Sequence, residues 1–265
     1  MKVNLLIDKQ TNFYFHVLTI CYPRKGYSSE EYRKKYKKFI PEEVINSFKK
    51  VSKKQWKKLY FCKNFEKAKR KIKEKKLLEK AENRSKGSFE KIWPEHLKKL
   101  KKFKENFEKF WSKYEKKALR TIESITNQKF KQKYFKFYLT LPIYDAFECF
   151  YGGIVLERSH FFAAEVLIHE IVHINLSNLR KKINLSESKR YALEELLVDL
   201  ITFSVCKKLF GERKTLEISS VKGEHRYWLD YLFLWELFLK ANQFDKFVDL
   251  LIYDFKTGRV SFIAT

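Results

Sequence analysis

The stretch Phe161–Leu179, FFAAEVLIHEIVHINLSNL, decides how this chain is interpreted. Its apolar residues and its lack of Gly and Pro predict a helix over about 161–178. Within it His169 and His173 are four residues apart, so both imidazoles lie on one helical face and can bind one metal ion. Glu170 is the next residue after His169, and we expect its carboxylate to reach a water bound to that metal ion. The competing interpretation is a pair of hydrogen-bonded core histidines, although burying titratable groups in so apolar a helix costs free energy.

A catalytic zinc site needs a third protein ligand and an open position for water. One known pattern, H-E-x-x-H-x-x-G-x-x-H, is excluded because Leu176 and Leu179 occupy the positions that require Gly and His. The other possible sources are an Asp a short distance downstream and a Glu from the next predicted helix, over about 185–209. A short connection near Asn184 joins the two helices and predicts an antiparallel hairpin.

Positions counted outward from this connection pair the two helices residue by residue. Glu195 lies at the height of His173, and Asp199 lies at the height of His169. Glu195 is therefore the predicted third metal ligand. Asp199 is the predicted acceptor for the ring N–H of the first imidazole, because carboxylates commonly orient metal-binding histidines in this way. Glu194 reaches the same height as Glu195, but it has no acidic residue four positions further on.

These residues resemble the gluzincin-type (thermolysin-like) zinc metallopeptidases, with a likeness limited to about residues 150–205. The matching residues are an H-E-x-x-H and an E-x-x-x-D on the following helix: His169, Glu170, His173, Glu195 and Asp199. The resemblance implies a zincin-like catalytic core, one Zn²⁺ per chain, a peptide or protein substrate, and Glu170 as general base. It also implies a strand before the metal helix that pairs with extended substrate, for which Gly153, Ile154 and Val155 are the candidates.

A peptidase of this kind also needs a group that stabilises the oxyanion of the transition state. The candidates are His225, Tyr227 and Tyr191. His225 lies in a Gly-containing loop before an aromatic segment, which suits a side chain that reaches into a site. The competing interpretation of His225 is an ordinary surface histidine.

The formal net charge of +25 is distributed very unevenly. Residues 1–150 hold 41 Lys and Arg against 17 Asp and Glu, whereas residues 151–265 are almost neutral. A basic half suits nucleic acid, an anionic membrane surface or an acidic partner. The competing interpretation is a solvated Lys-rich surface, because Lys and Glu alternate around its helical runs, and no nucleic-acid-binding motif is recognisable. The alternative function is therefore a nucleic-acid-associated basic protein with a structural or accessory zinc site.

The composition, with 45% apolar residues, seven Gly and four Pro, predicts a mainly α protein with a small β-sheet (α+β). We expect a basic, mostly helical region over 1–130 and a zincin-like domain over 131–265. In the second region, strands over about 135–144 and 152–157 precede the metal helix, and an aromatic helical segment follows the ligand helix.

The first half contains one ambiguous segment and one predicted break. Residues 12–21 form either a strand or a buried helix, since periodicity does not distinguish the two. Residues 83–88 are the predicted linker, and Pro94 is predicted to open the next helix. The chain shows no secretory signal and no membrane-spanning stretch, and its four scattered cysteines include no C-x-x-C pair, so we expect a cytoplasmic location.

Overall fold

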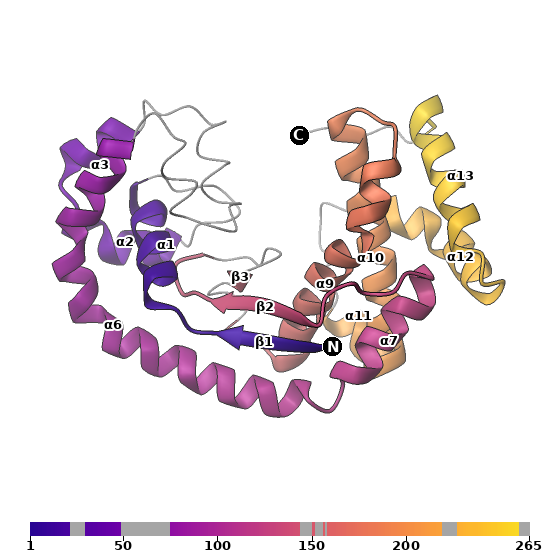
Figure 1. Ribbon diagram of the computed structural model, residues 1–265, viewed down its shortest axis with the longest axis horizontal. Helices are drawn as coiled ribbons and strands as arrows, with labels where there is room; N and C mark the ends of the chain where they lie inside the picture. Colours follow the sequence, from indigo (N-terminus) through magenta and orange to yellow (C-terminus); the bar gives the residue numbers. More distant parts are fainter. Residues whose placement is uncertain are drawn as a thin grey trace. The chain divides into compact units, whose positions relative to one another are not determined.

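The computed structural model describes residues 1–21, 30–48, 75–143, 150–151, 156, 158–218 and 227–259. The fold is mainly helical with one small sheet, as predicted (Figure 1). The chain forms two compact units that interleave along the sequence. Unit 1 comprises Met1–Lys2, Trp111–Phe135 and Ala164–Thr265, and unit 2 comprises Val3–Phe110 and Lys136–Ala163. These units are not the regions 1–130 and 131–265, and that functional division stays a prediction.

Helix α1 (Lys9–Cys21) is the central helix of the unit 2 core. Asp8 caps its start, because the Asp8 carboxylate accepts a hydrogen bond of 2.6 Å from the backbone N–H of Thr11. Every residue from Thr11 to Cys21 is buried. A helix buried on all sides shows no amphipathic period, which explains why the sequence alone left strand and helix open.

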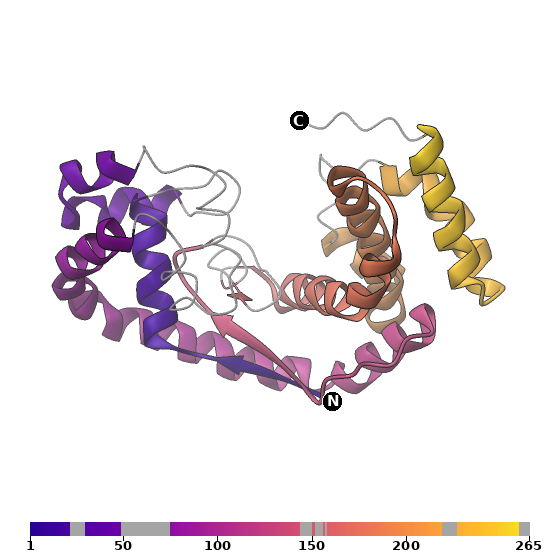
Figure 2. The same cartoon turned by 45° about the horizontal axis from the view of Figure 1, so that its top comes forward.

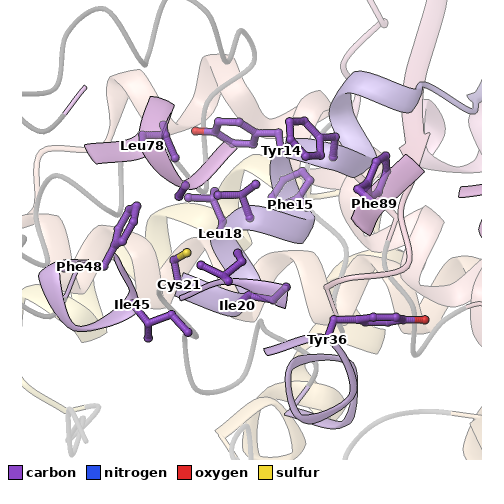
Figure 3. Packing of buried hydrophobic residues seen from close by; sticks show 14 of the residues in the cluster. Tyr14, Phe15, Leu18, Ile20, Cys21, Tyr36, Ile45, Phe48, Leu78 and Phe89 are labelled. Atoms are coloured by element: carbon purple, nitrogen blue, oxygen red, sulfur yellow. The ribbon is translucent and has the colours of Figure 1, made fainter. Parts of the chain in front are cut away.

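Three short helical elements and one long helix surround α1. They are α2 (Glu30–Tyr36), the 3₁₀ helix Lys37–Phe39, α3 (Glu42–Phe48) and α6 (Lys75–Trp111). Figure 3 shows the side chains of α1 clustered with Phe48 of α3 and Leu78 of α6, all of them buried. Each large apolar side chain buried in this way contributes about 1.5–3 kcal/mol.

Helix α6 overturns the prediction of a linker at 83–88 and of a helix start at Pro94. It runs without interruption through both, over 37 residues. The hydroxyl of Ser85 donates to the carbonyl of Ala81 at 2.8 Å, inside the helix, so it does not end the helix. Ala81, Phe89 and Leu100 are buried along one face on both sides of the expected breaks. This packing outweighs the local cost of Gly and Pro, because tertiary contacts supply most of the stability of a helix.

The sheet has the strand order β1-β2-β3 and consists of β1 (Lys2–Leu6), β2 (Tyr134–Leu139) and β3 (Phe150–Tyr151). Strands β2 and β3 are parallel, with Tyr138 opposite Phe150. The predicted strand at 135–144 therefore exists but ends at Leu139 among the described residues. The predicted strand at 152–157 falls mostly outside the described residues, and its one described member, Leu156, has a helical backbone.

Unit 1 is built around α10 (Glu187–Phe210). This helix contacts α7 (Glu115–Thr126), α11 (Glu212–Ile218), α12 (Tyr227–Lys240) and α13 (Phe244–Thr257). Figure 2 shows α10, α12 and α13 as neighbouring helices. None of the described helices is long and apolar enough to span a lipid bilayer.

Helices α9 (His160–Lys182) and α10 confirm the two helices predicted at 161–178 and 185–209, with ends that differ by a few residues. Gly211 closes α10 with a φ of 86°, and its N–H bonds the carbonyl of Lys207 at 3.0 Å. A residue with a side chain is strained at this φ, so glycine suits the end of this helix.

Candidate metal centre

Helix α9 holds two imidazoles one turn apart on a single face. Four apolar residues close to His169 and His173 in the sequence are fully buried: Leu167, Ile168, Ile171 and Val172. These side chains fix the rotation of the helix in the core, so the face that carries the imidazoles is fixed as well. The side chain of His169 remains 26% exposed and that of His173 remains 19% exposed, so solvent reaches both rings.

Helix α10 brings a carboxylate to the same point. The Nε2 atoms of His169 and His173 are 3.2 Å apart. The carboxylate of Glu195 lies 3.5 Å from each Nε2, with one oxygen toward each ring. Among the described residues these three form the only group of His, Cys, Asp or Glu whose ligand atoms converge closely enough to hold a metal ion.

Each imidazole has a second carboxylate behind it. The Nδ1 atom of His169 lies 3.3 Å from Asp199, as the register of the two helices predicted. The Nδ1 atom of His173 lies 3.0 Å from the carboxylate of Glu194, which is buried. An acceptor at Nδ1 fixes the orientation of the ring and favours the tautomer in which Nε2 carries a lone pair.

These contacts explain why the centre suits a cation. When both neutral imidazoles donate their Nδ1 protons to the carboxylates behind them, each Nε2 presents only a lone pair. His169, His173 and Glu195 then place three acceptors around one point with no donor between them. Tetrahedral zinc with bonds of about 2.0–2.1 Å separates its nitrogen and oxygen ligands by about 3.3–3.4 Å. The two Nε2 atoms, 3.2 Å apart, are close to that spacing, and each lies 3.5 Å from a different oxygen of Glu195.

Without a metal, protons are the other cations that can satisfy these groups. Burial lowers the pKa of His173, but hydrogen bonds to Glu194 and Glu195 outweigh it and raise the pKa to about 9. Burial likewise opposes charge on His169, yet its bonds to Asp199 and Glu195 hold its pKa well above 6.5. Burial raises the pKa of Glu195, and the two imidazoles lower it further than burial raises it. The carboxylates therefore create a site that strongly attracts positive charge.

The remaining predicted site residues are placed only in part. Glu170 is buried next to His169, and its charge contributes to the raised pKa of that imidazole. Tyr227 begins α12, but its side chain lies outside the described residues. His225 and the candidate substrate strand at Gly153, Ile154 and Val155 also lie outside the described residues.

Two other side chains, those of His160 and Tyr191, are among the described residues. His160 packs in unit 2 against the rings of Phe107 and Phe110, with centroids 6.1 and 5.5 Å away. Tyr191 is on α10 with 53% of its surface exposed, one helical turn before Glu195.

Glu194 is the residue whose role sequence reasoning missed. From the sequence, Glu194 is only an alternative ligand to Glu195, and it has no acidic residue four positions further on. The reasoning that paired His169 with Asp199 applies equally to His173, which also needs an acceptor at Nδ1. Glu194 is at the right height on α10 and could have been found in this way.

No protein-family model matches the chain, and searches of the curated proteins and of the solved structures give no match either. We therefore infer function from the geometry of the centre.

Proposed function

We propose that this chain is a zinc-dependent metallopeptidase with a gluzincin-like site. One observation carries the proposal: the Nε2 atoms of His169 and His173 and the carboxylate of Glu195 converge closely enough to hold one metal ion. The carboxylates of Asp199 and Glu194 behind the two rings support it, because they orient both imidazoles for metal binding.

The donor set favours zinc over other common ions. Two imidazoles and one carboxylate suit zinc, whereas Mg²⁺ and Ca²⁺ prefer sites made wholly of oxygen. Three protein ligands are typical of catalytic zinc, and four are typical of structural zinc. The ligand side chains are 15–26% exposed, which leaves room for solvent at a fourth position. A bound zinc ion supplies Lewis acidity that polarises the scissile carbonyl.

The residues of the chain supply the rest of the reaction. The carboxylate of Glu170 takes a proton from the attacking water and delivers it to the leaving amine nitrogen. Asp199 and Glu194 hold the two imidazoles in orientation throughout. We assign stabilisation of the oxyanion to His225 or Tyr227, and pairing with an extended peptide to residues 153–155. The gluzincin resemblance supplies these last assignments.

Metal analysis combined with one conservative variant tests the proposal. Purified protein should bind about one zinc per chain and cleave an unstructured protein such as casein. Glu170→Gln should retain zinc and lose cleavage, because the amide cannot accept the proton. Glu187→Gln, an exposed change at the start of α10, is the control and should keep both properties. Wild-type protein that binds no zinc, or Glu170→Gln that cleaves normally, would overturn the proposal.

A further inference from the structure

The face of α6 directed away from the core carries a row of cations. Residues 80, 84, 91, 98 and 102 are separated by four, seven, seven and four positions, so they share one helical face. All five are basic and all are exposed. We call them the α6 cation stripe: Lys80, Arg84, Lys91, Lys98 and Lys102. The buried residues of α6, among them Phe89 and Phe107, occupy the opposite face.

The acidic residues of α6 do not neutralise this stripe. Four of them pair with lysines outside the stripe, at 2.9–3.8 Å: Glu79 with Lys75, Glu95 with Lys99, Glu105 with Lys109 and Glu108 with Lys104. No carboxylate of the described residues lies within ion-pair distance of a stripe residue. Among the described residues, the stripe therefore keeps an excess of positive charge, although Glu95 and Glu105 lie three or four positions from stripe lysines.

The stripe follows α6 from Lys80 to Lys102, and α6 changes direction along its length (Figure 1). At 1.5 Å per residue the stripe follows about 33 Å of helix axis. Each phosphate of a nucleic-acid duplex carries a negative charge that a lysine or arginine can neutralise.

We propose that the α6 cation stripe binds the phosphate backbone of double-stranded nucleic acid without preference for base sequence. Phosphate contacts position a protein on a duplex but do not read its sequence. The stripe belongs to unit 2, whereas the metal centre belongs to unit 1, so the two proposals rest on different residues.

The side chains around the stripe favour a duplex over other anionic partners. The exposed residues of α6 include no aromatic and no large aliphatic side chain. Binding of single strands commonly relies on aromatic side chains that stack on bases. A helix that lies on a membrane needs an apolar face to insert among the lipids. An exposed surface that offers only cations fits the phosphate backbone of a duplex.

The test compares two triple variants of the full-length protein by fluorescence anisotropy with a labelled 24-base-pair duplex of mixed sequence. Lys91→Glu/Lys98→Glu/Lys102→Glu removes three stripe charges. The matched control changes three exposed lysines of unit 1 by the same total charge: Lys240→Glu/Lys246→Glu/Lys256→Glu. At 0.1 M salt the stripe variant should bind about 100- to 500-fold more weakly, and its log–log salt slope should be about 2.7 smaller. The control should lose much less affinity.

Three results would overturn this inference. The first is the absence of duplex binding by the wild-type protein at low salt. The second is an equal loss of binding in the two triple variants, which would indicate net charge alone. The third is binding to phosphatidylserine-rich vesicles or to polyglutamate that is at least as tight as binding to the duplex and is lost in the stripe variant. Circular dichroism checks folding, and the neutral triple Lys91→Gln/Lys98→Gln/Lys102→Gln replaces the charge-reversed one if that variant is unfolded.

Discussion

Replacing Glu194 with Gln tests the metal centre at the contact that sequence reasoning did not foresee. The Glu194 carboxylate lies 3.0 Å from Nδ1 of His173 and is only 5% exposed. Glutamine has the same shape, so the variant should fold. It replaces a charged acceptor with a neutral amide, and hydrogen bonds to charged groups are about twice as strong as neutral ones.

The expected loss is a 10- to 100-fold weaker affinity for zinc, which is about 1.4–2.8 kcal/mol. The cause is that the orientation of the His173 ring is less restricted and its Nε2 becomes a weaker ligand for zinc. Asp199→Asn should cost a similar amount through His169. The double variant should lose more than either single variant, because the two acids support different rings.

The assay is a competition titration between metal-free protein and a chromophoric zinc chelator. Glu187→Gln, which makes the same chemical change on the exposed start of α10, should bind zinc as the wild type does. If a well-folded Glu194→Gln variant binds zinc as tightly as this control, the carboxylate does not support His173 and the proposed arrangement of the centre is wrong.

Three further outcomes follow from named features. Burial and the nearby His96 lower the pKa of His16 to about 3, and burial lowers the pKa of His96 to about 4. Both values lie below the ordinary histidine pKa of about 6.5, so the unfolded chain takes up protons at a higher pH than the folded chain does. The free energy of unfolding therefore falls as the pH drops below about 6.5, by up to about 1.4 kcal/mol per pH unit for each histidine. Urea midpoints at pH 7 and pH 5 measure this fall, which His96→Gln should reduce; equal midpoints would contradict it. Gly87→Ala should stabilise the protein by about 0.5–1 kcal/mol in urea unfolding, because the site is helical and exposed and an added Cβ meets nothing within 4 Å; a destabilised variant would show that α6 is not helical there. Chelation should remove about 2.7 kcal/mol of stability measured with zinc at 100 times its Kd, and unchanged melting with and without zinc would argue against the centre.

The two proposals stand or fall separately. Zinc binding and peptide cleavage depend on side chains of α9 and α10 in unit 1, and duplex binding depends on α6 in unit 2. If the protein cleaves peptides but does not bind DNA, the proposal for the metal centre remains and only the proposal for the α6 cation stripe is wrong. The reverse result would leave a basic nucleic-acid-binding protein with an unexplained cluster of histidines and carboxylates.

Helical period and a short connection between helices were enough to predict the main relations in the metal centre from the sequence. His169 and His173 share a face because they are four residues apart. Glu195 and Asp199 come opposite them because a short loop makes the two helices antiparallel. These relations need no knowledge of the core, so the structure reproduces them. The net charge and its concentration in residues 1–150 are likewise properties of composition.

The continuity of α6, the role of Glu194 and the α6 cation stripe depend on long-range packing. Residues 83–94 read as a break, yet α6 continues through them because its buried face packs in the core of unit 2. Glu194 supports His173 because the rotation of α10 directs that carboxylate inward, and neighbouring helices set this rotation. The α6 cation stripe exists only once burial of one face has directed the opposite one outward. In each case long-range packing chooses which side of a helix is exposed, and a linear pattern contains no such choice.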